Sequence, residues 1–438
     1  MTIVARAASG AISIIRLSGV RALELAKTLS GGGELSPRHA HLKKLYSKSG
    51  ELLDEALVIY FKAPASFTGE DVVEFHTHGG EAASSAIIDE LLALGARAAN
   101  PGEFSKRAVL NGKMDLAKAE SIAAMIEARS AGAAKMLART LCGELGEFCS
   151  SLRKELIYIL AHCEACIDYG DDDLPSDVLE GILERLDASI ARLESIVSIS
   201  EQRKGLIDGF KIAIIGKPNV GKSSILNALL AYDRAIVSNK AGTTRDTIEE
   251  SVNFGGVLVR FVDTAGIRTS SDEIEKIGIE YSKKAANDAD IIIAVFDASK
   301  DKSKEDDEII KLLASYEKTK ILVLNKCDLN LEFPTSSLPN EPIKISAKDD
   351  ITGLKKEIKK LASFEQSGEL MLTSNRQISL VKAALKELKE AVFKLNESEL
   401  EIFAFHINAA LKNIAAITEP AYNSDILDAM FSSFCLGK

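Results

Sequence analysis

The chain has 438 residues, of which 46% are hydrophobic and 27% are charged, so it can bury sizeable apolar cores and is not a disordered polymer. Its formal net charge of −10 excludes a protein whose whole surface attracts nucleic acid, while leaving room for a local basic patch. Aromatic residues make up only 5% of the chain and tryptophan is absent, which argues against an extended base-stacking platform.

The cysteines and the N-terminus indicate the compartment. Six cysteines are scattered along the chain, too few and too dispersed for a disulfide scaffold, and they fit a reducing environment. The N-terminal run Thr2–Ala8 contains Arg6 and is too short for the apolar core of a signal peptide. No run approaches 18 uncharged apolar residues. We therefore expect a cytoplasmic protein that does not enter a membrane.

The first zone, residues 1–113, has the texture of an α/β domain. Short β-rich runs predict strands at Ala11–Leu17, Ala56–Phe61 and Val72–Phe75, and Ser84–Leu94 predicts a helix. His76 and His78 alternate within such a run, but they lack a third metal ligand, so we expect a structural or ligand-adjacent role for them.

Residues 114–208 are rich in Ala, Leu, Ile and Glu and predict the first part of a helical domain. The acidic break Asp168–Asp177 contains Pro175 and predicts a loop between two long helices. Cys163 and Cys166 have the C-x-x-C spacing of a zinc site, but no second ligand pair follows at a matching distance. We therefore expect these thiols to pack within a helix rather than bind zinc.

Residues 209–363 alternate between short β-branched runs and helical patterns, such as those at Ile274–Ala286 and Glu305–Ser315. This alternation predicts a mostly parallel sheet covered by helices. Residues 364–438 are helical again, so the simplest topology inserts the α/β unit into one helical domain. The strands that we expect in the unit are Lys211–Ile215, Val257–Val262, Ile291–Val295, Ile321–Leu324 and Pro342–Ile345.

A phosphate-binding loop follows the first strand of this unit. Residues 216–223, Gly-Lys-Pro-Asn-Val-Gly-Lys-Ser, fit G-x-x-x-x-G-K-[ST] and open a predicted helix, Lys222–Leu230. Glycines let successive backbone N–H groups surround phosphate oxygens, and the helix N-terminus adds its positive dipole end. We predict that the nucleotide-binding residues of this loop are Asn219, Val220, Gly221, Lys222, Ser223 and Ser224.

Three further motifs follow later strands and indicate guanine. An aspartate after a strand, as in residues 263–266, can reach Mg²⁺, while the carboxylate of Asp328 can accept two N–H bonds from guanine that adenine does not offer. In this order and spacing the motifs resemble the GTPase branch of P-loop proteins, so we expect GTP and GDP as ligands. The predicted contacts are Asp263, Thr264, Ala265, Gly266, Asn325, Lys326, Asp328, Ser346 and Ala347.

The catalytic groups are less clear from the motifs. We expect Ser223 and Thr244 to ligate Mg²⁺, because Thr243 and Thr244 lie where a γ-phosphate-sensing loop occurs. Ras-type GTPases carry a water-orienting Gln directly after the D-x-x-G glycine, but this chain has Ile267 there. Either Glu273 or Glu275 can supply an acid, and Asn219 with the loop 238–244 can hold a monovalent cation in place of an arginine finger.

Three stretches outside this unit resemble the MnmE (TrmE) family of tRNA-modification GTPases. They are Phe-Thr-Gly-Glu-Asp-Val-Val-Glu at 67–74, Asn-Pro-Gly-Glu-Phe-Ser-Lys at 100–106 with the segment 111–120 after it, and the terminal Phe-Cys-Leu-Gly-Lys at 434–438. Together with the GTPase-like unit, the resemblance covers essentially residues 2–438. Residues 7–11 depart from the Gly/Pro-richer run that family members usually carry.

The resemblance implies an N-terminal folate-binding and dimerisation domain (1–113), and a helical domain (114–208 and 364–438) split by a Ras-like GTPase domain (209–363). It places the catalytic acid at Glu275 and implies Mg²⁺ and K⁺ as cofactors. It implies potassium ligands at Asn219, Ser238, Lys240 (through its carbonyl) and Thr243. Folate contacts fall on Arg16, Glu74, Lys113 and Lys438, with Cys435 a candidate for the one-carbon chemistry.

The resemblance also implies partners and a reaction. The family forms homodimers whose GTPase domains meet in the presence of potassium, and it works with an FAD-dependent MnmG-type protein that holds the flavin. Together the two proteins add an aminomethyl-type (carboxymethylaminomethyl) group to C5 of the wobble uridine of certain tRNAs, using a methylene-tetrahydrofolate. A heterotetramer with the flavoprotein is therefore expected.

Two other functions compete with this one. A ribosome-assembly switch GTPase would carry similar GTPase motifs, but such proteins often append a KH domain, and the pattern after Ala362 is helical. A folate-sensing regulatory GTPase without modification chemistry of its own is the second alternative.

Overall fold

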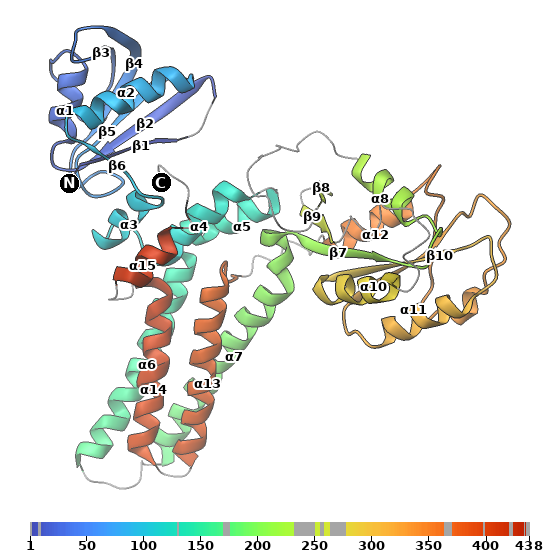
Figure 1. The fold of residues 1–438 in the computed structure, drawn as a ribbon. Helices are drawn as coiled ribbons and strands as arrows, with labels where there is room; N and C mark the ends of the chain where they lie inside the picture. The colour runs from blue at the N-terminus through green and yellow to red at the C-terminus, as the bar shows by residue number, and fades with distance from the viewer. Residues whose placement is uncertain are drawn as a thin grey trace. The chain divides into compact units, whose positions relative to one another are not determined.

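The computed structural model describes residues 2–7, 10–128, 131–169, 176–231, 250–254, 258–262, 277–362, 370–396, 399–419, 424–432 and 434. It divides into two compact units. One comprises Met1–Ala123, Thr140–Glu194 and Ser374–Lys438, and the other comprises Ala124–Arg139 and Ser195–Thr373. The order of an α/β part, a helical part, a second α/β part and a final helical part confirms the predicted fold class (Figure 1). The predicted domain boundaries at residues 113, 208 and 363 stay predictions.

The N-terminal part is a mixed sheet of six described strands in the order β3-β4-β5-β2-β1-β6. The three predicted strands are present, and the structure adds three that the sequence patterns did not indicate, namely β1, β3 and β6. The strands are β1 (Ile3–Ala7), β2 (Ile12–Ser18), β3 (Ala40–Tyr46), β4 (Leu52–Phe61), β5 (Val72–His78) and β6 (Arg97–Ala98).

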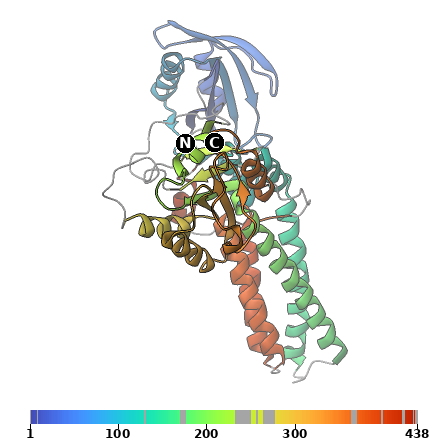
Figure 2. The ribbon, with the colours of Figure 1, turned by 90° about the vertical axis from the view of Figure 1, so that its right-hand side faces the viewer.

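Helices α1 (Ala22–Leu29) and α2 (Glu81–Ala93) cover one face of this sheet (Figures 1 and 2). Alternate strand residues such as Ile15 and Phe75 are fully buried against these helices. The opposite face carries Ile12, Leu42 and Leu57, which are 64%, 64% and 43% exposed. Leu42 pairs with Leu57 in the register of β3 and β4, so apolar side chains lie next to each other on an open face.

A small apolar cluster joins the N-terminal part to the end of the chain. Helices α3 (Glu103–Leu110), α4 (Leu116–Glu127) and α15 (Ser424–Phe431) contribute Val109, Leu116, Leu427 and Phe431 to it. Gly102 precedes α3 with φ +65°, and a Cβ there would lie 2.6 Å from the Phe431 carbonyl oxygen. Only glycine therefore fits this approach of α15.

The long helices of the helical part run side by side (Figures 1 and 2). They are α6 (Glu144–Tyr169), α7 (Ser176–Asp208), α13 (Asn375–Asn396) and α14 (Leu400–Thr418), with α5 (Ala131–Leu141) before them. The predicted break Asp168–Asp177 includes the end of α6 and the start of α7, and its residues 170–175, Pro175 among them, lie outside the described residues. Cys163 of α6 is buried, and its thiol donates to the Leu400 carbonyl at 3.5 Å, so this cysteine packs between helices.

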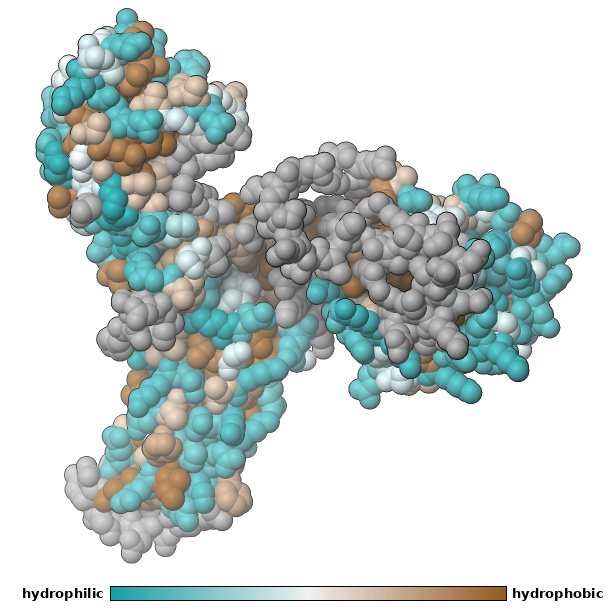
Figure 3. Space-filling view, viewed as in Figure 1, coloured by the Kyte–Doolittle hydropathy of each residue, from teal (hydrophilic) through white to brown (hydrophobic). Residues whose placement is uncertain are grey.

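By length and composition, α14 is apolar enough to cross a membrane. In the structure it packs against α6 and α13 and buries Phe403, Ile407, Ala410 and Ile414. Hydrophilic and hydrophobic residues are interspersed on the visible face of these helices (Figure 3). Helix–helix packing therefore buries part of the apolar surface of α14, while Ile402 and Phe405 remain 43% and 67% exposed.

An ion-pair cluster fixes the start of α13. The guanidinium of Arg376 donates to both carboxylate oxygens of Glu120 at 2.7 and 2.9 Å, and also to the carbonyls of Ala416 and Ile417 at 2.6 and 3.0 Å. Gln377, which is fully buried, donates to the same carboxylate at 2.6 Å. The cluster joins α4, α13 and the end of α14 at the point where the chain returns from the second unit.

The second sheet has the order β12-β11-β10-β7-β9-β8, and every pairing is parallel except that of β8 with β9. This confirms the predicted mostly parallel sheet. Its strands are β7 (Phe210–Ile215), β8 (Glu250–Asn253), β9 (Leu258–Phe261), β10 (Ile291–Asp297), β11 (Thr319–Asn325) and β12 (Ile343–Lys344). Its described helices are α8 (Lys222–Leu230), α10 (Ile277–Asp288), α11 (Lys304–Ala314) and α12 (Thr352–Ala362), with the 3₁₀ turn η2 (Thr335–Ser337).

Tyr60 of β4 gives the N-terminal part a testable pH dependence. Its hydroxyl donates to Asp71 Oδ1 at 2.9 Å, and burial together with the Asp71 carboxylate raises the pKa of Tyr60 from 10.0 to about 12. Between about pH 10 and pH 12 the folded chain thus keeps the phenol proton, whereas the unfolded chain loses it. The stabilisation is complete below about pH 10 and decreases as the pH rises from about 10 to 12.

We expect Tyr60→Phe to lose less stability than the parent as the pH rises from about 10 to 12, because the titrating phenol is gone. The measurement is urea unfolding at about pH 9 and about pH 11. Tyr46→Phe, in the neighbouring strand β3, is the control and should keep the pH dependence of the parent. A Tyr60→Phe protein with the parent's loss of stability between the two pH values would contradict the assignment.

Candidate functional site

The predicted nucleotide motifs meet at one edge of the second sheet. The loop beginning at Gly216 follows β7, Asn325 ends β11, and Ser346 follows β12. These strands are parallel, so their carboxyl ends lie at the same edge, which is where ligands bind in open α/β sheets. The structure therefore brings the described residues of these motifs to one edge of the sheet, and their contacts to a nucleotide stay predictions.

The phosphate-binding loop has a backbone that requires its glycines. Gly221 has φ +98° and is the N-cap of α8, and a Cβ there would lie 2.2 Å from Asn325 Nδ2. A Cβ on Gly216 would lie 2.6 Å from the Val295 carbonyl oxygen. Asn219, with φ +64°, is one of the non-glycine residues in the left-handed region, which asparagine adopts more readily than most residues.

Lys222 is already oriented within the loop. Its ammonium donates to the carbonyl oxygens of Gly216 and Lys217, both at 2.8 Å. Among the described residues, the loop thus uses two of the three ammonium hydrogens, which leaves the third for a phosphate. Burial lowers the pKa of Lys222, and the N-terminus of α8 adds a positive dipole end beside it. The arrangement suits a polyanion such as a nucleotide phosphate.

Asn325 connects three loops. Its side chain is buried, with the residue 2% exposed; Nδ2 donates to the Val220 carbonyl at 2.8 Å, and Oδ1 accepts from the Ala347 N–H at 2.9 Å. The first contact reaches the phosphate-binding loop and the second reaches the loop after β12. Recognition of guanine O6 by the Ala347 N–H would share or replace this hydrogen bond.

Lys326 forms a second link to the phosphate-binding loop. Its ammonium donates to the Asn219 carbonyl at 2.8 Å and to Asp297 Oδ2 at 2.6 Å. Burial works to raise the pKa of Asp297, but hydrogen bonds from Lys326 and Ser299 outweigh it and hold that pKa below its usual range. Asp297 was not among the predicted site residues. Its position at the end of β10, beside Asn325 in the register, is the signal that could have indicated it.

A third link joins the loop to α11. Lys217 Nζ lies 2.7 Å from Asp306 Oδ2 and 3.1 Å from Ser303 Oγ. Sequence reasoning missed this pair, although the Ser-x-x-Asp spacing of Ser303 and Asp306 is that of a helix capping box. The structure contains that capping box.

The remaining predicted GTPase residues fall into two groups. Ser223, Ser224 and Asp328 are described and are exposed to solvent, as ligand-contacting groups at the edge of a sheet need to be. The others lie outside the described residues, namely Ser238, Lys240, Thr243, Thr244, Asp263, Thr264, Ala265, Gly266 and Glu275.

The predicted folate residues Arg16 and Glu74 are in direct contact. They are opposite each other in the register of β2 and β5, and the guanidinium donates to Glu74 Oε1 from Nε at 2.9 Å and from Nη2 at 2.6 Å. The guanidinium carbon also lies 5.1 Å from the Phe67 ring centroid and 5.7 Å from that of Phe104. The two side chains remain 21% and 15% exposed. A charged pair beside two aromatic rings can hold a flat heterocycle with polar edges.

Lys113 lies beside the loop 67–71, which carries Phe67. Among the described residues it makes no contact with Arg16. A Cβ on Gly69 would lie 3.1 Å from Lys113 Cγ, so the lysine stem lies over the loop 67–71. Arg107 supports this loop by donating to Glu70 Oε2 at 2.7 Å. The structure therefore brings three of the predicted folate residues to one segment. Lys438 and Cys435 lie outside the described residues.

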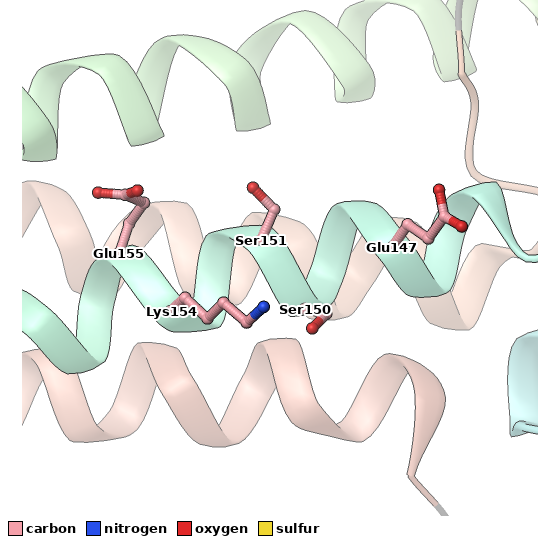
Figure 4. A pocket seen from close by; sticks show the side chains of 5 residues that line it. All are labelled: Glu147, Ser150, Ser151, Lys154 and Glu155. Carbon is pink, nitrogen blue, oxygen red and sulfur yellow. The ribbon is translucent and has the colours of Figure 1, made fainter.

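A shallow hollow of about 360 Å³ on α6 is not a comparable site (Figure 4). Two of its lining residues are already used between helices, since Arg185 donates to Glu155 at 2.6 Å and Arg192 to Ser151 at 3.4 Å. All of its lining side chains come from one helix, with no contribution from a strand end or a glycine-rich loop. They are Glu147, Ser150, Ser151, Lys154 and Glu155.

Comparison with known proteins covers nearly the whole chain. The family described as GTP-binding protein TrmE N-terminus matches residues 1–113, and the MnmE helical domain matches residues 116–435. A tRNA modification GTPase MnmE of Campylobacter fetus is 58% identical over the full length of both chains. That of Campylobacter concisus is 54% identical over 98% of this chain and 97% of its own.

Among solved structures, the crystal structure of Era in complex with MgGDPNP and nucleotides of 16S ribosomal RNA is 28% identical. The match covers 41% of this chain and 66% of that chain, with a TM-score of 0.27. A TM-score of this size is too low to bear on function.

Gly221 offers a direct test of the nucleotide site. We expect Gly221→Ala to weaken GDP binding by about a hundredfold or more, because a methyl group would displace the Asn325 amide and the φ of +98° is unfavourable for alanine. Binding can be measured by titration with a fluorescent GDP analogue.

Gly181→Ala is the matched control, since Gly181 lies within α7 and a Cβ there would meet no atom within 4 Å. That variant should bind GDP normally and gain up to about 1 kcal/mol of stability; equal GDP affinities for both variants would contradict the assigned site.

Proposed function

Given that the chain belongs to the MnmE family of tRNA modification GTPases, and is therefore a GTP hydrolase that takes part in tRNA modification, we propose its specific reaction. It installs an aminomethyl-type (carboxymethylaminomethyl) group at C5 of the wobble uridine of certain tRNAs. The one-carbon unit comes from a methylene-tetrahydrofolate, and an FAD-dependent MnmG-type partner supplies the flavin. The arrangement of Arg16, Glu74, Phe67 and Phe104 is the observation that carries the folate part of this proposal.

The nucleotide is GTP, bound by the edge of the second sheet. Asp328 is exposed in the loop after β11, and its carboxylate would accept the guanine N–H groups, while the ammonium of Lys222 would donate to a phosphate. Ser223 at the start of α8 fits a hydroxyl ligand for Mg²⁺, with Thr244 as the second proposed ligand. The metal would neutralise charge on the β- and γ-phosphates.

Potassium takes the place of an arginine finger in this proposal. Asn219 fits an oxygen ligand, because its backbone carbonyl is already bound by Lys326 and its side chain is exposed, with no side-chain hydrogen bond among the described residues. The other proposed ligands are Ser238, the Lys240 carbonyl and Thr243, and the proposed catalytic acid is Glu275. A cation here would add positive charge near the transferring phosphate when two GTPase domains meet.

GTP turnover should therefore depend on the monovalent cation. We expect turnover in potassium to exceed that in sodium by about tenfold or more, and Glu275→Ala to lose the potassium-dependent part. Glu273→Ala, two residues away, is the control and should keep it. The measurement is phosphate release at equal ionic strength, and equal rates of the parent in both salts would contradict the potassium mechanism. If Glu273→Ala loses the potassium-dependent turnover and Glu275→Ala keeps it, the catalytic acid is Glu273 instead.

The folate site is completed from the end of the chain in this proposal. Phe434 packs edge to face on Phe431, with ring centroids 4.8 Å apart, and its Cβ would lie 3.0 Å from a Cβ on Gly102. Gly102 immediately precedes α3, which carries Phe104. Cys435 and Lys438 follow Phe434 in the chain, and we assign them to the folate site as a candidate for the one-carbon chemistry and as a ligand.

The open face of the N-terminal sheet supports homodimerisation. Ile12, Leu42 and Leu57 form an exposed apolar face of the kind that a second copy covers in obligate dimers. A dimer that binds two copies of the flavoprotein would form a heterotetramer with tRNA as its substrate. We place this assembly in the cytoplasm, where tRNA and reduced folates are found.

The reaction is tested by analysing wobble uridines by mass spectrometry in cells that lack the protein. We expect the modified uridine to disappear, to return with the parent gene, and not to return with Arg16→Met, which retains GTP turnover. Arg21→Met is the control, because Arg21 at the N-cap of α1 forms a solvent-exposed ion pair with Glu24, and it should restore the modification. Arg16 is chosen because its guanidinium binds Glu74 at 2.6 Å and lies over the rings of Phe67 and Phe104, so that its removal takes away both contacts.

The result also separates the alternatives. An unchanged uridine profile in cells lacking the protein would exclude the modification reaction and favour a ribosome-assembly switch or a folate-sensing regulator. Modification that depends on GTP turnover but not on Arg16 would retain the reaction and exclude the assigned folate site.

A further inference from the structure

Lys217 is the second residue of the phosphate-binding loop, and its side chain points away from solvent. It is 11% exposed, and its ammonium lies 2.7 Å from Asp306 Oδ2 and 3.1 Å from Ser303 Oγ. The side chain of Asp306 is fully buried. A buried ion pair of this kind has its partners fixed in position, because separating them leaves an uncompensated charge.

Asp306 is itself held rigidly by the first turn of α11. Its Oδ2 atom accepts from the backbone N–H and the hydroxyl of Ser303, both at 2.9 Å, in a capping box. The other carboxylate oxygen, Oδ1, is buried and has no hydrogen-bond partner among the described residues. The positive end of the α11 dipole and the Lys217 ammonium therefore stabilise this carboxylate in addition to the two hydrogen bonds from Ser303.

The ion pair acts on Lys222, the residue that we expect to bind the nucleotide phosphates. The Lys217 carbonyl oxygen is one of two acceptors that orient the Lys222 ammonium, at 2.8 Å. A displacement of the Lys217 backbone would therefore turn the ammonium of Lys222 and its remaining hydrogen. The order of contacts is Asp306 to the Lys217 side chain, the Lys217 carbonyl to Lys222, and Lys222 to phosphate.

We infer that Asp306 is a positioning residue of the GTPase, which holds the first turn of the phosphate-binding loop through Lys217 and thereby orients Lys222 toward the β-phosphate of a guanine nucleotide. The pair holds the side of the loop near Lys217, while Lys326 and Asp297 hold the side near Asn219. Asp306 does not touch the nucleotide in this arrangement. Asp306 should therefore strengthen the binding of GDP and of GTP to the same extent, because both carry the β-phosphate.

The test compares Asp306→Asn with the double variant Lys217→Met and Asp306→Asn in the full-length chain. Asparagine keeps an oxygen for the capping box but lacks the negative charge, and methionine fills the volume of lysine without its charge. The double variant therefore has no unpaired buried charge, and its thermal unfolding should be close to that of the parent. Titration with fluorescent GDP and with GTP gives the dissociation constants, and phosphate release gives kcat and KM.

We expect both variants to bind GDP and GTP about tenfold more weakly, with KM affected in the same ratio. Asp307→Asn is the matched control, since Asp307 occupies the same helical turn and pairs with Lys302 at the surface; it should bind like the parent. Parental affinity in the double variant would overturn the inference, whatever Asp306→Asn does alone, because the pair would then contribute only to stability. A double variant that does not fold would also overturn it, by showing that the pair is a folding element.

Discussion

The buried carboxamide of Asn325 holds the nucleotide site together by joining loops that are distant in the sequence. Its two ends contact the Val220 carbonyl and the Ala347 N–H, and the close fit of Gly221 against its nitrogen leaves no room for a side chain. A phosphate-binding loop consists largely of backbone and has few side chains to stabilise it, so its shape depends on such outside contacts. Lys217 and Lys326 supply two more, each through a buried or nearly buried carboxylate.

The ligand-facing part of this site could be predicted from the sequence, because each motif is short and its residue types are dictated by phosphate or guanine chemistry. Gly221 and Lys222 lie at the end of the loop after β7 and Asp328 lies in the loop after β11, while their contacts to a nucleotide stay predictions. The supporting pairs could not be predicted in the same way. Lys217 and Asp306 are 89 residues apart, and their contact exists only because β7 and β10 are neighbours in the sheet and α11 follows β10.

In the N-terminal part, too, single residues could be expected from the sequence, but the contacts between them could not. Arg16 and Glu74 were expected as separate folate contacts from a family resemblance, but their ion pair depends on the register of β2 with β5, which no local pattern specifies. The strand β3 was not predicted, since its sequence Ala-His-Leu-Lys-Lys-Leu-Tyr buries only Leu45 and so lacks a clear alternation. It is an edge strand with one open face, and edge strands commonly carry such charged residues.

The cluster between α3, α4 and α15 has a consequence for biosynthesis. Lys106 and Asp428 form an ion pair across 322 residues of sequence, and Val109 and Leu116 are covered by Leu427 and Phe431. During translation the apolar side chains of α3 and α4 leave the ribosome long before those that cover them. The domains between can fold as units in the meantime, but this surface stays exposed until the last helix has been synthesised, so the nascent chain has an exposed apolar patch that the finished protein does not have.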